Sequence, residues 1–174
     1  MKKILTFLLL VLSLSLFLAP AALAADLNLV ADGADLLTYD EWDTLNKRAE
    51  EISEKHQCDV AVVIIDEMSD DDGAYDWAKY IYEEYHFGYG SSKSGLLLFL
   101  SMADRDYALI AYGYGNTAFT DHGKDVLLDD FVLPLLGNNN YYQAFGVYLN
   151  KADEYLTMAR AGTPALRYSH TGSV

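Results

Sequence analysis

Seven residues could carry chemistry, because they lie beside segments that the sequence predicts to be strands. They are Asp32, Asp35, Asp66, Glu67, Asp104, Arg105 and Asp106. Oxygen ligands from several carboxylates are what Ca²⁺ or Mg²⁺ requires. We therefore predict that Asp32 and Asp104 bind one divalent cation, with Ca²⁺ as the first choice and Mg²⁺ as the second. Asp66 or Asp35 would complete the ligand set. The alternative is that each carboxylate is a turn or strand-end residue that accepts backbone hydrogen bonds.

Arg105 has two competing interpretations. Its guanidinium could bind an anion, either a phosphate or a carboxylate group, through two parallel hydrogen bonds. It could also pair with Asp104, Asp106 or Asp66 and act as a structural clamp. Because neighbouring acids outnumber this arginine, the clamp is the favoured prediction.

Several familiar catalytic arrangements are missing from the sequence. The histidines lack the spacing of a zinc-binding helix, and no serine lies in a Gly-x-Ser-x-Gly context. No phosphate-binding P-loop is present. The single cysteine, Cys58, excludes an internal disulfide and directly precedes an apolar strand, so we expect a buried thiol. We assign no catalytic residue.

Alternating strand and helix patterns predict the elements that position these residues. Apolar runs predict buried strands at Asp59–Asp66 and Gly95–Leu100, and the latter pairs with Tyr107–Tyr112 in a hairpin whose tip is Met102–Arg105. A short edge strand is expected around Leu27–Ala31. Helical periodicity predicts helices at Tyr39–His56, at Ala74–His86, in one segment after Thr120 that Pro134 kinks or ends, and at Tyr141–Ala161. The second helix is expected to bury Trp77, Ala78, Ile81, Tyr82 and Tyr85.

This order of elements predicts the fold class and the place of the acids. Strand, helix and strand form a βαβ unit with parallel strands, which a hairpin extends into a short mixed sheet. We predict a single α/β domain, a three-layer α/β/α sandwich with Rossmann-like character. Residues that follow parallel strands lie at one end of the sheet, where ligands bind in open α/β folds. The acidic residues are therefore expected to share one rim.

Composition and charge narrow the classes of partner. The chain has 174 residues and a formal net charge of −14. Such a surface repels nucleic acid and anionic lipid and suits cations or a basic partner, or it serves only solubility. Residues 1–24 have the basic start, apolar run and Ala-Leu-Ala ending of a signal peptide, with cleavage near Ala24. We expect a secreted or extracytoplasmic protein, no transmembrane helix in the mature chain, and a disordered tail over residues 162–174.

Several segments together resemble the TPM domain, a family also called TPM phosphatase. Val30–Thr38 resembles its opening motif, and Gly95–Leu98, Asp104-Arg105 and Gly113–Gly115 resemble its middle. Thr120-Asp121 and Tyr141–Gly146 are compatible with its end. The resemblance covers roughly residues 28–158, so the chain divides into a signal peptide, a TPM-like domain over residues 25–161 and the tail.

The resemblance implies a compact α/β/α sandwich that is secreted, periplasmic, lumenal or membrane-tethered. Members of the family have been linked to acid phosphatase activity, to calcium binding and to upkeep of membrane protein complexes. Two features depart from the family. The loop Ser91–Ser94 lacks the carboxylate that often precedes the first hairpin strand. Many bacterial relatives carry a transmembrane helix after the domain, and here we expect none.

The resulting prediction is a secreted calcium-binding module that interacts with or maintains envelope proteins. The alternative is a metal-assisted acid phosphatase that hydrolyses phosphomonoesters at the same acidic rim. In that case the metal would polarise the phosphoryl oxygen, and Asp104 or Asp32 would ligate the metal or act as the nucleophile. The sequence shows no nucleophile–base pair, which favours the binding module.

Overall fold

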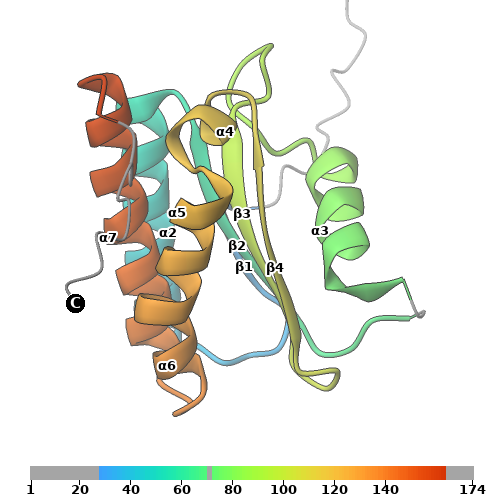
Figure 1. The fold of residues 1–174 in the computed structure, drawn as a ribbon. Coiled ribbons are helices and arrows are strands. Elements are labelled where there is room, and N and C mark those ends of the chain that lie inside the picture. The colour runs from blue at the N-terminus through green and yellow to red at the C-terminus, as the bar shows by residue number, and fades with distance from the viewer. Residues whose placement is uncertain (1–27, 70–71, 164–174) are drawn as a thin grey trace, which may run out of the picture.

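Strands and helices alternate along the first half of the chain, and helices dominate the second half (Figure 1). The structure, a computed structural model, describes residues 28–69 and 72–163. Its elements are β1 (Val30–Asp32), α2 (Tyr39–His56), β2 (Asp59–Ile65), α3 (Gly73–Glu84), β3 (Gly95–Ser101), β4 (Asp106–Tyr112), α4 (Tyr114–Ala118), α5 (Asp121–Val126), the π-helix η2 (Leu127–Val132), α6 (Leu133–Leu136) and α7 (Tyr141–Arg160).

The strands form one mixed sheet with the order β1-β2-β3-β4. β1, β2 and β3 are parallel, and β4 returns antiparallel to β3 through a turn that begins after Ser101 and ends at Asp106. Both the parallel pairing and the hairpin confirm the predictions from sequence. The carboxyl ends of the three parallel strands therefore lie at the same end of the sheet, which is at the bottom of Figure 1.

Two apolar cores lie on the two faces of the sheet, so the predicted three-layer α/β/α sandwich is confirmed. Alternate residues of β3 face opposite cores: Leu96, Leu98 and Leu100 pack with α2, η2 and α7, whereas Leu97 and Phe99 pack with α3. This explains why every residue of β3 is buried. Figure 1 shows α3 alone on its side of the sheet, opposite the layer of the other helices.

The first helix begins and ends where the sequence predicted, because its ends carry strong local signals. The Thr38 side chain accepts a hydrogen bond from the Glu41 backbone N–H, and the Glu41 carboxylate accepts one from the Thr38 backbone N–H. The chain leaves the helix through Gln57, which is left-handed with a φ of 50°. The capping box and the left-handed residue together fix both boundaries.

The segment after β4 is more broken than expected. A short helix, α4, precedes the expected one, and the expected helix is divided into α5, η2 and α6. The Thr120 side chain caps its start by accepting from the Gly123 backbone N–H. The π-turn places Leu127 and Val132, five residues apart, in the core. The helical spacing of the sequence instead predicts an apolar stripe of Val126, Leu127, Phe131 and Leu135. Pro134 lies in the first turn of α6, where its missing N–H costs little.

β1 is one of the two edge strands of the sheet, and side chains of α2 cover its outer side. β1 spans three residues and begins later than the predicted edge strand. The Val30 backbone N–H donates to Asn46 Oδ1 at 3.0 Å, and the Val30 carbonyl accepts from Trp42 Nε1 at 2.8 Å. Two side chains of α2 thus take the place of a neighbouring strand, which blocks strand addition here.

No helix in the described ranges is long and apolar enough to cross a membrane. The predicted signal peptide and almost all of the predicted disordered tail lie outside the described residues.

Candidate functional site

The three predicted cation ligands lie at one end of the sheet, on loops that follow adjacent parallel strands. Asp32 ends β1, Asp66 follows β2, and Asp104 lies in the turn after β3. The Gly33 N–H donates to the Ile64 carbonyl at 2.9 Å, and the Ala103 N–H donates to the Asp66 carbonyl at 2.7 Å. The Asp66 loop is therefore bordered by the Asp32 loop on one side and by the hairpin tip on the other. The common rim expected from sequence exists.

Asp104 ties two of these loops together. Its Oδ2 accepts hydrogen bonds from the Met68 backbone N–H at 2.8 Å and from the Ser101 hydroxyl. Both bonds favour the charged form of the carboxyl and so lower the pKa of Asp104. The bond from Ser101 has the larger effect, and the bond from Met68 has the smaller one. Asp104 is thus an ionised carboxylate that accepts a backbone hydrogen bond, as the alternative to metal binding predicts.

Asp32 is held in a different way. Its Oδ2 accepts from the Leu37 backbone N–H at 2.8 Å, across the turn that leads into α2. Its Oδ1 is buried and has no hydrogen-bond partner in the described part of the chain. Buried carboxylate oxygens are almost always paired, so this one is a site where a cation or a water molecule would be stabilised.

The remaining rim acids are one residue that caps a helix and three whose carboxylates have no partner among the described residues. Asp106 Oδ2 accepts from the Ala74 N–H at 3.2 Å and so caps the start of α3 from the neighbouring hairpin. Asp35, Asp66 and Glu67 are exposed, and their carboxylates make no hydrogen bond or ion pair with described residues. Asp66 lies between the other two predicted ligands and is free to turn toward either.

Within residues 28–69 and 72–163, no group of three or more Asp, Glu, His or Cys side chains is arranged to hold a metal ion. The fold brings the three loops together, but Asp32 and Asp104 each face a different backbone donor. The rim therefore supplies carboxylates that would have to turn toward one ion.

Arg105 does not form the predicted clamp. It makes no ion pair with any described residue, although it lies between two aspartates in the sequence. The reason is that Asp104 and Asp106 bind backbone N–H groups of Met68 and Ala74, on the α3 side of the sheet. Arg105 has a φ of 52° and lines a cavity of about 220 Å³ on the opposite side.

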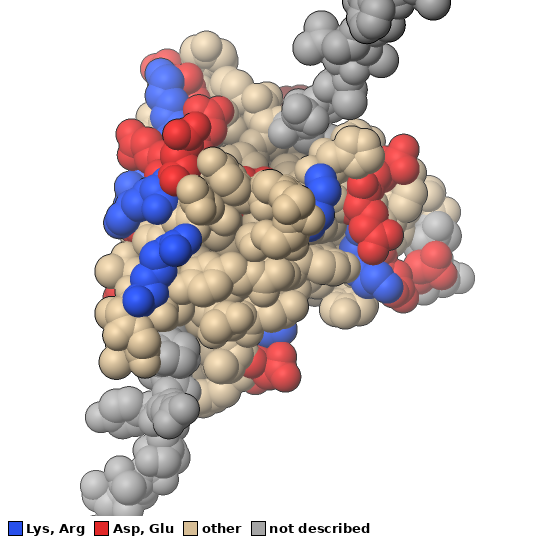
Figure 2. Space-filling view, turned by 90° about the horizontal axis from the view of Figure 1, so that it is seen from above, with Lys and Arg blue, Asp and Glu red and all other residues tan. Residues whose placement is uncertain are grey.

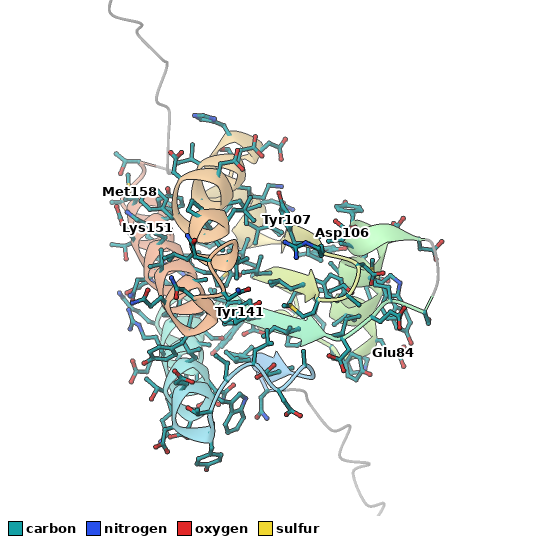
Figure 3. All side chains as sticks on the ribbon, turned by 90° about the horizontal axis from the view of Figure 1, so that it is seen from below. Glu84, Asp106, Tyr107, Tyr141, Lys151 and Met158 are labelled. Atoms are coloured by element: carbon teal, nitrogen blue, oxygen red, sulfur yellow. The ribbon has the colours of Figure 1, made fainter. Side chains whose placement is uncertain are left out.

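That cavity combines a guanidinium with hydroxyl and amide groups. Its polar lining residues include Ser101, Tyr107, Asn139 and Tyr141, beside apolar side chains of α6. Figure 3 views this end from below and shows Asp106 nearer to α3 and Tyr107 nearer to the helices of the other layer. The Tyr141 hydroxyl already donates to Asn139 Oδ1 at 2.9 Å. Asp106 lines the cavity as well, so it presents both a guanidinium and a carboxylate.

An ion-pair cluster at the opposite end of the sheet was not predicted. The Asp153 carboxylate contacts Arg48 at 2.8 Å, Lys55 at 2.6 Å and His56 at 2.6 Å, and so joins α7 to α2. Figure 2, which views this end, shows acidic and basic side chains mixed on the side of α2 and α7. Partners about a hundred residues apart leave no local pattern, so the sequence held no signal for this cluster.

Cys58 is a buried structural thiol, as expected. Burial, and secondarily the neighbouring Asp59 carboxylate, raises the pKa of its thiol to about 12. A thiol that stays protonated is a poor nucleophile, which agrees with the absence of a catalytic assignment for it.

The fold and the rim define a class: a single α/β/α domain with a short mixed sheet and carboxylates at the ends of its parallel strands. The sequence profile of the TPM domain matches residues 30–155, which is more than half of the chain. The chain therefore belongs to the TPM domain family. No match was found among curated proteins.

Solved structures share the fold. The N-terminal domain of a protein from P. gingivalis has a TM-score of 0.64 at 22% identity, covering 83% of this chain and 89% of that one. The BA42 protein from the psychrophilic bacterium Bizionia argentinensis has a TM-score of 0.62 at 14% identity, covering 78% and 90%. The N-terminal domain of the cg2496 protein from Corynebacterium glutamicum has a TM-score of 0.55 at 14% identity, covering 84% and 90%. At these identities the likeness concerns the fold alone.

Proposed function

We propose that this TPM domain is an extracytoplasmic module that binds one divalent cation, Ca²⁺ in preference to Mg²⁺, and contacts envelope proteins. Asp32, Asp66 and Asp104 would supply the ligands. The observation that carries the proposal is the buried Asp32 Oδ1, which lacks a hydrogen-bond partner among the described residues. A cation beside this oxygen would offset the cost of burying it unpaired.

Two further features support a cation at this rim. Asp66 is exposed, has no side-chain partner in the described ranges, and follows the strand between those of the other two ligands. The net charge of −14 also raises the local concentration of cations around the domain. Carboxylate oxygens from three separate loops match the variable coordination of Ca²⁺ better than the strict octahedron of Mg²⁺.

Calorimetric titration of the purified protein with CaCl₂ and with MgCl₂ tests the proposal. We expect saturable heat with Ca²⁺, a rise in the melting temperature, and reversal of both by a chelator. Asp32→Asn and Asp66→Asn should each abolish the heat. Asp121→Asn is the matched control, because that side chain is 98% exposed on α5 and distant from the rim in the chain. If Ca²⁺ gave neither binding heat nor a rise in the melting temperature of the unmodified protein, the proposal would be contradicted.

The extracytoplasmic location is tested separately. If residues 1–24 are a signal peptide, protein recovered from outside the cytoplasm begins at Ala25. Recovery of the chain only from the cytoplasm, with Met1 retained, would contradict this part of the proposal and leave the cation site unaffected.

One observation favours the alternative function, a metal-assisted acid phosphatase. Arg105 has no ion pair within the described chain and lines a cavity beside the rim, so its guanidinium is available for a phosphoryl group. In that case p-nitrophenyl phosphate is hydrolysed only with Ca²⁺ or Mg²⁺, and Arg105→Leu and Asp104→Asn each remove the activity. Metal-independent hydrolysis that survives Asp104→Asn would contradict both site assignments.

A further inference from the structure

Helix α3 covers only part of its face of the sheet. It packs on β3 and β4, and no helix within the described ranges packs on β1 from that side. The result is a groove of about 430 Å³ between α3 and the edge strand β1. Its floor is apolar and includes Ala31, Val63 and Ile65.

Aromatic side chains form the walls of this groove. Trp77 and Tyr80 come from α3, Tyr85 directly follows that helix, and Trp42 comes from α2 on the other side of β1. Tyr80 is 57% exposed and Tyr85 is 42% exposed, although Tyr85 was predicted to lie in the core. Exposed aromatic residues gathered around one apolar groove mark a binding surface rather than scattered surface residues.

The charges around the groove have one sign. Among the described residues, Asp32 is the only charged one that lines it, and a neighbouring cavity that shares Trp77 and Tyr80 adds Asp72 and Asp76. No lysine, arginine or histidine of the described chain lines either cavity. Aromatic faces beside carboxylates attract a guanidinium or ammonium group, through cation–π contact and ionic attraction together.

The groove does not suit a strand that would extend the sheet. The outward-facing N–H and carbonyl of Val30, which such a strand would need, already bind Asn46 and Trp42. A ligand in this groove is therefore held by its side chains.

We propose that the groove binds a segment of a partner protein in which arginine residues alternate with apolar residues. The apolar side chains would cover the floor, and the guanidinium groups would stack on Tyr80, which shares a cavity with Asp72 and Asp76, and on Tyr85. This rests on the partner contact proposed above and names its chemistry. Asp32 belongs to both sites, and Asp72 and Asp76 beside Tyr80 are the groove's acids that lie outside the cation site.

Tryptophan fluorescence reports on this groove, because the chain has two tryptophans and both line it, Trp77 at the border with the neighbouring cavity. The probe is a synthetic peptide in which arginine alternates with leucine. We expect a saturable change in emission that weakens with added salt. A peptide with citrulline in place of arginine keeps the shape without the charge and should bind at least about tenfold more weakly.

Variants of α3 locate the site. Tyr80→Ala should weaken binding of the arginine peptide by about tenfold, whereas Tyr80→Phe, which keeps the ring, should bind normally. Tyr75→Ala is the matched control, because Tyr75 is 63% exposed on the same helix and lines a different cavity. Ca²⁺ titration of Tyr80→Ala should be unchanged, which keeps this test separate from that of the cation site.

Three outcomes would overturn the inference. The first is that the citrulline peptide binds as tightly as the arginine peptide. The second is that Tyr80→Ala binds like the unmodified protein. The third is that the protein alone forms a dimer that Tyr80→Ala dissociates, which would assign the groove to a second copy of the chain.

Discussion

The Asp104 carboxylate accepts a hydrogen bond from the Met68 backbone N–H at 2.8 Å, and so joins the β3–β4 turn to the loop after β2. Together with the Ala103–Asp66 backbone bond, it holds two of the three rim loops against each other. An acidic residue that the sequence predicts to be a metal ligand therefore has a structural role, which can be tested apart from the proposed metal binding.

Replacing Asp104 with alanine should loosen the loop after β2. The Met68 amide would lose its acceptor, so its hydrogen exchange should become faster. The Ala74 amide, which Asp106 holds, should keep its protection. Hydrogen exchange followed by NMR measures both amides in one sample. Unchanged exchange at Met68 would show that the contact does not hold the loop.

Gly115→Ala should destabilise the domain. A Cβ at this position would lie 2.3 Å from the Gly95 carbonyl oxygen, so α4 could not approach the start of β3 as closely. Overpacking of this kind costs about 1–3 kcal/mol. The control is Gly146→Ala in α7, where a Cβ would meet nothing within 4 Å. That substitution should stabilise the helix by up to about 1 kcal/mol. Urea denaturation compares the two variants, and equal effects would refute the close approach.

Asn46→Ala should expose the edge strand. Asn46 is 7% exposed, and its Oδ1 is the acceptor for the Val30 N–H. An unpaired N–H there should cost about 1–3 kcal/mol of unfolding free energy. Glu50→Gln, which changes only the other partner of Asn46, serves as the control and should cost much less. Thermal unfolding compares the two variants. An Asn46→Ala protein as stable as the unmodified one would contradict the role of Asn46 in capping the edge strand.

Stability should fall in acid because of Asp153. Its burial raises the pKa of the carboxyl, but hydrogen bonds from Lys55, His56 and Arg48 outweigh this and lower the pKa from 3.8 to about 2. Since the pKa is lower in the folded protein, the stabilisation is complete above about pH 4 and is lost as the pH falls toward about 2.

Asp153→Asn should remove that contribution, which amounts to about 2 kcal/mol near neutral pH. The unfolding free energy of the variant should also depend less on pH between about 4 and 2. Asp43→Asn, which breaks the exposed pair with Lys47, should cost less than about 1 kcal/mol. Denaturant unfolding across the acid range makes the comparison. A variant with an unchanged acid profile would remove Asp153 as the cause.

Local signals in the sequence predicted the elements accurately where a cap or an apolar run was strong. The capping box at Thr38 placed the start of α2, and the apolar runs placed β2 and β3 within a residue. The weaker signals failed where packing decided the outcome. α4 was missed, and the π-turn moved the buried stripe to Val132. Tyr85 was expected inside, but α3 ends there and leaves it half exposed.

The sequence by itself determined the helices and strands and their order along the chain, because periodicity and caps act over only a few residues. The parallel strands of a βαβ unit then place Asp32, Asp66 and Asp104 at a common end of the sheet. Only the tertiary structure decided what each side chain contacts. Asp104 turned out to bind Met68, 36 residues away, and Arg48 to bind Asp153, 105 residues away. Such contacts depend on how distant elements pack, as does the groove beside α3, and no local pattern encodes them.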